Sequence, residues 1–72
     1  MENYVGKRLD SRYEIHEIIG VGGMSVVYKA YDNIDDRIVA VKILKEEFAN
    51  DDEFVRRFKN ESLRRRCYLL FW

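Results

Sequence analysis

Residues 19 to 32 read I-G-V-G-G-M-S-V-V-Y-K-A-Y-D, and three glycines fall within four positions of this stretch. Glycine lets a backbone approach a phosphate group closely and turn its N–H groups toward the anion. The spacing alone is a weak signal, because Ser25 stands where a G-x-G-x-x-G pattern has its third glycine. A flexible hairpin would explain the same residues. A β-rich run follows the glycines, whereas a dinucleotide-binding loop is followed by a helix, so that class of site is not expected.

Two charged residues strengthen the phosphate interpretation. Lys42 interrupts the apolar run I-V-A-V-K-I-L, and Glu61 falls on the helical face predicted for Phe54 and Phe58. These residues resemble the arrangement in protein kinases, where the glycine hairpin that covers the nucleotide phosphates is accompanied by a lysine on the third strand and a glutamate on the next helix that holds this lysine. That arrangement also requires a valine after the loop to cover the base, which Val27 supplies.

Each of these charged residues also has a plainer interpretation. Lys42 would then be a strand lysine whose ammonium group reaches water, and Glu61 an ordinary residue of a helix surface. Against that interpretation, a carboxylate on a buried apolar stripe needs a partner. The ordered set of glycines, lysine and glutamate therefore favours a phosphate site.

Local patterns predict the elements that position these residues. Tyr13–Ile19, Ser25–Tyr31 and Ile38–Leu44 are rich in β-forming residues and are separated by turn-forming segments. Asp51 is a suitable N-cap for a helix that carries Phe54 and Phe58. The sequence predicts an α+β fold: an antiparallel meander of about three strands, one helix, and an irregular apolar tail after Glu61, where the helical pattern fails.

Bulk composition excludes several classes of protein. The 72 residues allow one domain, and 13 basic residues balance 13 acidic ones, so no overall attraction to nucleic acid or anionic membrane is expected. The arginines at 64 to 66 are interpreted as a solvated face or as frame-shifted sequence rather than a nucleic-acid patch. Cys67 is the only cysteine, and neither a metal site nor a membrane segment is predicted. We expect a cytoplasmic location.

The stretches I-G-V-G-G-M-S-V-V-Y-K-A-Y-D, V-A-V-K and F-V-R-R-F-K-N-E together resemble the amino-terminal lobe of bacterial eukaryotic-like serine/threonine protein kinases of the PASTA type. The resemblance covers residues 9–61 and implies an ATP site. Its loop would cover the phosphates, Lys42 would hold the α- and β-phosphates, and Glu61 would orient Lys42. The resemblance implies that the remaining binding residues are Ile19, Val27 and Ala40 around the adenine and Gly20, Val21, Gly22, Gly23, Met24 and Ser25 in the loop.

The resemblance stops at Glu61, and residues 62–72 are interpreted as a divergent tail, for which a shift of reading frame is the hypothesis. No H-R-D or D-F-G sequence occurs, so no catalytic residue is assigned and the chain alone is expected to be inactive. The chain is thus interpreted as a fragment of an ATP-dependent kinase that binds ATP weakly, while Mg²⁺ and protein substrates with Ser or Thr belong to a complete kinase. The parents of such fragments are often membrane-anchored through regions absent here.

Two alternatives remain open from the sequence. The chain would act as a non-catalytic fragment that binds an intact kinase through an unpaired strand edge and its apolar tail. It would otherwise be a non-functional truncated product, in which Val39, Val41 and Ile43 lack neighbours to bury them.

Overall fold

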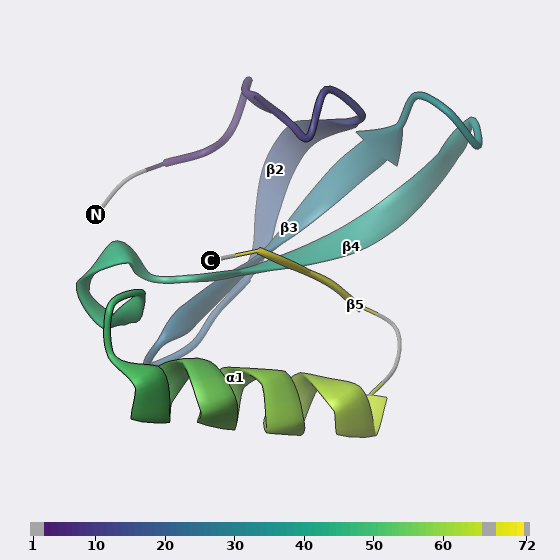
Figure 1. Ribbon diagram of the computed structural model, residues 1–72. Helices are drawn as coiled ribbons and strands as arrows, with labels where there is room; N and C mark the ends of the chain where they lie inside the picture. Colours follow the sequence, from purple (N-terminus) through teal and green to yellow (C-terminus); the bar gives the residue numbers. More distant parts are fainter. Residues whose placement is uncertain (1–2, 66–67, 72) are drawn as a thin grey trace.

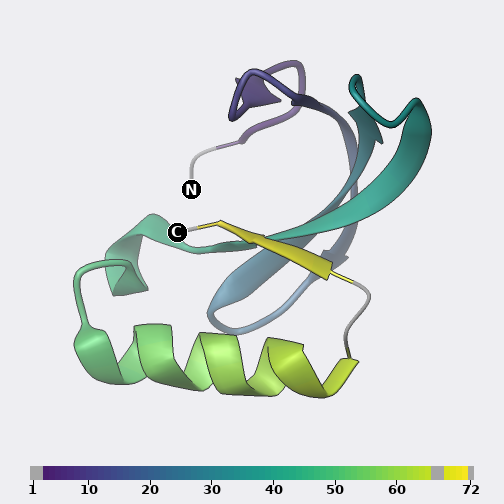
Figure 2. The same cartoon turned by 45° about the vertical axis from the view of Figure 1, so that its right-hand side comes forward.

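The computed structural model describes residues 3–65 and 68–71, with side chains as far as Glu61. One curled sheet with the strand order β1-β2-β3-β4-β5 lies beside a single α-helix. Figure 1 and Figure 2 show the helix running along one end of the sheet, beneath the β2–β3 turn. The elements are β1 (Arg8–Leu9), β2 (Tyr13–Val21), β3 (Ser25–Asp32), β4 (Arg37–Leu44), the 3-10 helix η1 (Glu46–Phe48), α1 (Asp52–Arg65) and β5 (Tyr68–Phe71).

The predicted three-stranded meander is confirmed. β2 pairs antiparallel with β3, and β3 pairs antiparallel with β4 over its whole length, from Ser25 opposite Leu44 to Asp32 opposite Arg37. Each strand extends one or two residues beyond the predicted limits. β-branched and aromatic residues fill both strands of the second pair, as a half-buried pleated surface favours.

The expectation of an irregular tail is wrong for its backbone. The helix continues through Arg65, because leucine and arginine are good helix formers. Residues 68–71 then form β5, which pairs in parallel with β4. Parallel neighbours require a long crossover, and α1 provides it between β4 and β5. The edge of β4 that the sequence left unpaired thus finds backbone partners.

The core lies on one face of the β2–β3–β4 sheet. Its centre consists of residues that are almost fully buried, and the half-buried side chains of Tyr4, Leu9 and Val39 pack against them. The buried members are Tyr13, Ile15, Val26, Tyr28, Ala30, Val41 and Ile43. Val41 and Ile43 are therefore covered, contrary to the expectation that the short sheet leaves them without neighbours.

The segment before β2 closes this face of the core. Hydrogen bonds join the Gly6 N–H to the Ile15 carbonyl and the Ile15 N–H to the Lys7 carbonyl, each at 2.9 Å. The Tyr4 ring meets the Tyr28 ring edge-on, with centroids 6.1 Å apart. Aromatic pairs of this geometry contribute beyond the area that they bury. These contacts hold residues 4–7 over the sheet.

A buried ion pair fastens the β3–β4 turn to the start of β2. Arg12 donates from Nε to Asp32 Oδ1 at 2.7 Å and from Nη2 to Asp32 Oδ2 at 2.8 Å, and the Asp32 side chain is completely buried. The amides of Ile34 and Asp35 also donate to Asp32 Oδ1. The hydrogen bonds from Arg12 hold the pKa of Asp32 well below its usual range, and the two amides act in the same direction against the effect of burial.

The start of α1 follows the sequence prediction. The Asp51 carboxylate accepts hydrogen bonds from the N–H groups of Glu53 and Phe54, so it caps the helix as expected. Phe58, one turn further, is fully buried. Across the described part of the chain, no helix combines the length and the apolar character that crossing a membrane requires.

Candidate functional site

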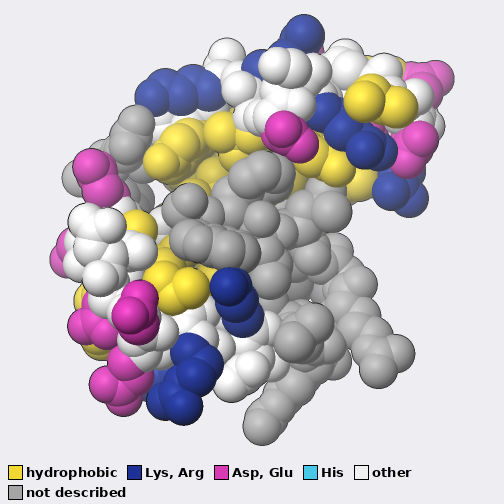
Figure 3. All heavy atoms as spheres, in the orientation of Figure 1, with side chains coloured by type: hydrophobic (Ala, Val, Ile, Leu, Met, Phe, Trp, Pro, Cys, Tyr) yellow, Lys and Arg dark blue, Asp and Glu magenta, His cyan; other side chains and the backbone are white. Residues whose placement is uncertain are grey.

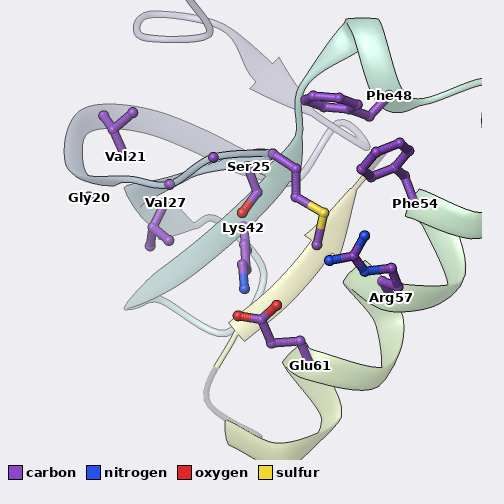
Figure 4. A pocket seen from close by; sticks show the side chains of 12 residues that line it. Gly20, Val21, Ser25, Val27, Lys42, Phe48, Phe54, Arg57 and Glu61 are labelled. Carbon is purple, nitrogen blue, oxygen red and sulfur yellow. The ribbon is translucent and has the colours of Figure 1, made fainter.

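An open pocket lies between the glycine turn and α1, with a volume of about 680 Å³. Its walls come from the β2–β3 turn with the start of β3, the end of β4, the short helix η1 and the face of α1 that points toward the sheet (Figure 4). The structure brings all but two of the predicted binding residues to this pocket, namely Gly20, Val21, Gly22, Gly23, Met24, Ser25, Val27, Lys42 and Glu61.

The glycine turn is closed by a short backbone hydrogen bond. The Gly22 N–H donates to the Ser25 carbonyl at 2.8 Å, so this N–H is used within the turn. A Cβ atom at Gly23 would meet nothing within 4 Å, whereas one at Gly22 would lie 3.4 Å from the Ser25 carbonyl oxygen. The backbone at Gly23 is thus open to a ligand in the pocket.

The turn is also joined to the segment after β4. The Lys45 N–H donates to the Met24 carbonyl at 2.8 Å, and Lys45 Nζ donates to the Gly23 carbonyl at 3.3 Å. The Phe48 N–H in turn donates to the Lys45 carbonyl. The position of the glycine turn is therefore coupled to that of η1.

Lys42 forms the floor of the pocket. It lies near the end of β4, opposite Val27 in β3 and Leu70 in β5, and only 8% of it is exposed. Its ammonium nitrogen is 5.7 Å from the centre of the Phe58 ring. An aromatic face beneath an ammonium group offsets part of the cost of burying its charge.

Glu61 reaches the pocket from α1. In Figure 4 its carboxylate and the Lys42 ammonium group point toward one another. The sequence placed Glu61 on a buried stripe with Phe58, and this is wrong for the carboxylate, since Glu61 is exposed while Phe58 is fully buried. Glu61 lies three residues after Phe58, and at this position of α1 the side chain faces the open pocket rather than the sheet.

Two predicted residues do not line this pocket. Ile19 is 55% exposed near the end of β2. Ala40 lies on the same face of β4 as Lys42, two residues earlier and opposite Lys29. Both lie further along the sheet than the glycine turn.

Three residues complete the pocket that were not assigned to a site from the sequence: Phe48, Phe54 and Arg57. For Phe54 and Arg57 a signal existed, because Arg57 lies four residues before Glu61 and Phe54 three residues before Arg57, and both spacings keep a residue on the same helical face. Phe48 offered no such signal, since it lies in the short helix η1 and reaches the pocket only through the tertiary fold.

The histidine, the cysteine and the arginines at 64 to 66 were also considered from the sequence, and they lie apart from the pocket or outside the described residues. His16 is exposed, with Nε2 3.1 Å from Glu14 Oε1, and its ring stacks on that of Tyr31. Both basic and acidic side chains are present on the face of the described residues that Figure 3 shows. Among the described residues, no group of three or more potential metal-ligating side chains comes together. Cys67, Arg66 and the side chains of Arg64 and Arg65 lie outside the described residues.

Several known proteins are similar in sequence to this chain. The serine/threonine-protein kinase PrkC of Bacillus subtilis is 55% identical over 58 residues, which are 81% of this chain and 9% of the relative. A probable serine/threonine-protein kinase of Clostridium acetobutylicum is 57% identical over 58 residues, with the same two shares. The serine/threonine-protein kinase PknA of Mycobacterium tuberculosis is 47% identical over 62 residues, 86% of this chain and 14% of the relative. No protein-family model matches the chain.

These comparisons confirm the resemblance to the amino-terminal lobe of bacterial serine/threonine protein kinases. The chain spans about a tenth of the length of these relatives, between 9% and 14%. The names of these relatives thus describe whole proteins, of which this chain matches a short segment.

Proposed function

We propose that this chain, which resembles the amino-terminal lobe of bacterial serine/threonine protein kinases, forms the phosphate-covering part of a kinase ATP site. The observation that carries the proposal is the placement of Lys42. A buried ammonium group lies under a glycine turn, at the floor of an open pocket. A phosphate anion above Lys42 would accept charge-assisted hydrogen bonds from its ammonium group.

The shape of the pocket fits a nucleotide. Its volume of about 680 Å³ is within the range of small-molecule sites, roughly 300–1,000 Å³. The open backbone at Gly23 allows close approach of an anion, and Val27 offers an apolar surface beside it. The adenine would extend toward Ala40 and Ile19, and the phosphates would lie between the glycine turn and Lys42.

Glu61 would act by positioning. A carboxylate that faces Lys42 would hold the ammonium group in the direction of the α- and β-phosphates. A pair of this kind is weak evidence for stability, because desolvation cancels much of the attraction. Its value would be the orientation of Lys42.

The chain alone would bind ATP without transferring phosphate. Its 72 residues contain neither an H-R-D nor a D-F-G sequence, which in kinases supply the catalytic base and the magnesium ligand. In a complete kinase the γ-phosphoryl group would pass from Mg²⁺-bound ATP to Ser or Thr of a protein. A site without the remaining parts of a kinase would be weak, with a dissociation constant on the order of 1 mM or above. An ATP-dependent role also implies a cytoplasmic location.

Titration of the 72-residue chain with ATP, followed by ¹H–¹⁵N NMR, tests this proposal. We expect shifts at the glycine turn, and Lys42→Met should weaken binding about tenfold or more, as loss of a hydrogen bond to a charged group predicts. Lys29→Met is the matched control, because Lys29 is a strand lysine outside the pocket. No shifts at the turn up to 10 mM ATP, or equal weakening by both variants, would refute the proposal.

A radiolabel assay tests the absence of transfer. With [γ-³²P]ATP, Mg²⁺ and a generic protein substrate, we expect no labelled product. Labelling that disappears in Lys42→Met would show that the chain carries its own catalytic groups.

The origin of residues 62–72 is a separate proposal. We propose that this stretch departs from the kinase pattern through a shift of reading frame after Glu61. Translation of the genomic sequence that follows this codon, in the other two frames, tests it: an H-R-D and a D-F-G sequence are expected there. Docking of the chain on an intact kinase stays a prediction, and the β4 edge on which it relied is paired with β5.

A further inference from the structure

Arg57 brings a second cation to the pocket, and the role proposed for Lys42 does not explain why Arg57 is there. It lines the pocket from α1, four residues before Glu61, so the two side chains share one helical face. In Figure 4 both project from α1 toward the sheet and the glycine turn. The neighbouring Arg56 is exposed and does not line the pocket.

An aromatic stack holds the Arg57 guanidinium group in place. Its Cζ atom lies 5.5 Å from the centre of the Phe54 ring. The Phe54 ring in turn packs against Phe48, with centroids 4.5 Å apart and an interplanar angle of 39°. Stacking on an aromatic face reduces the number of conformations that an exposed arginine explores, so less entropy is lost when it binds an anion.

The same stack is connected to the glycine turn. Phe48 belongs to η1, which is bonded through Lys45 to the carbonyls of Gly23 and Met24. The guanidinium group and the turn that would cover the phosphates are thus positioned by one continuous set of contacts. Movement of the turn would move the wall that carries Arg57.

The charges of the pocket indicate what Arg57 would bind. The charged residues that line it, among those described, are Lys42, Arg57 and Glu61. A nucleoside monophosphate presents a single phosphate group, which would lie against one wall, whereas the chain of a triphosphate is long enough to contact two walls. A guanidinium group also offers the two parallel donors that suit phosphate oxygens.

We propose that Arg57 binds the terminal phosphate of a nucleoside triphosphate and thereby sets the preference of this site for triphosphates over monophosphates. This inference rests on the proposed ATP site. Lys42 would hold the inner phosphates from the floor of the pocket, and Arg57 would hold the outer end from α1.

Binding of ATP and AMP to the 72-residue chain and to four variants of it tests this inference. We expect Arg57→Gln to weaken ATP binding about five- to tenfold and to leave AMP binding unchanged. A change of this size is the upper part of the range for an ordinary net hydrogen bond, as expected for an exposed group. Arg57→Lys keeps the charge without the planar fork and should fall between. Arg56→Gln removes the adjacent exposed arginine and should match the wild type with both nucleotides.

The outcomes separate this inference from the one on which it rests. If Lys42→Met abolishes ATP binding while Arg57→Gln leaves it unchanged, the role of Arg57 is wrong and the ATP site stands. Equal weakening of ATP and AMP by Arg57→Gln would also overturn it, because Arg57 would then act through the fold or through Glu61. If the wild-type chain binds neither nucleotide, both proposals fail. Far-UV circular dichroism of each variant, and the Arg57→Lys form, keep the test valid if Arg57→Gln is less stable.

Discussion

Replacement of Phe58 by alanine should separate α1 from the sheet. Phe58 is fully buried, whereas Phe54 and Val55 on the same helix are only half-buried. Truncation of a buried phenylalanine costs about 3–5 kcal/mol, because the apolar contacts are lost and a cavity remains. A chain of 72 residues has a total stability of roughly 4–11 kcal/mol, at about 0.05–0.15 kcal/mol per residue. Phe58→Ala should therefore remove about half of the free energy of unfolding or unfold the chain.

Urea unfolding followed by far-UV circular dichroism measures this loss. Phe58→Leu keeps most of the apolar volume and should cost roughly 1–1.5 kcal/mol. Asn60→Ala lies on the same helix at an exposed position and should change stability by less than about 0.5 kcal/mol. If the midpoint of Phe58→Ala equals that of Asn60→Ala, the helix is not held to the sheet by this side chain. The pocket between them would then have no fixed wall.

Three further perturbations follow from the structure. Asp32→Asn should lower Tm at pH 7, because Arg12 keeps a buried partner that no longer carries a charge. The folded-state pKa of Asp32 is lowered, so its stabilisation is complete above its unfolded pKa of about 4 and is lost as the pH falls below that value. The difference in Tm between wild type and Asp32→Asn should shrink from pH 7 to pH 3, and a constant difference would contradict this. Gly23→Ala adds a methyl group where nothing lies within 4 Å, so Tm should stay unchanged while ATP binding weakens; unchanged binding would show that phosphates do not approach this backbone. Tyr4→Ala removes the edge-on contact with Tyr28 and should lower the free energy of unfolding in urea by about 1–2 kcal/mol. An unchanged free energy would show that the residues before β2 do not close the core.

The sequence by itself determined the local elements and the order of the chemical groups. Three β-rich runs separated by turns gave three strands within two residues of the predicted limits. The cap at Asp51 was also correct, because a short carboxylate before a helix bonds to amides that are near it in the chain. The glycines, Lys42 and Glu61 could be identified together because their types and sequence order matched a required pattern, before any distance was known.

Only the tertiary structure decided which residues meet at the pocket and which are buried. Phe48 joins the glycine turn to α1 through hydrogen bonds and a ring contact with Phe54 that connect separate elements, and no local period encodes these contacts. β5 forms because the edge of β4 offers unpaired backbone groups and α1 returns the chain to it, whereas the apolar letters of the tail suggested only an irregular segment. Helical spacing placed Glu61 on the same face of α1 as Phe58. The position of the sheet decides that Phe58 is covered, whereas Glu61, three residues later, faces the open pocket.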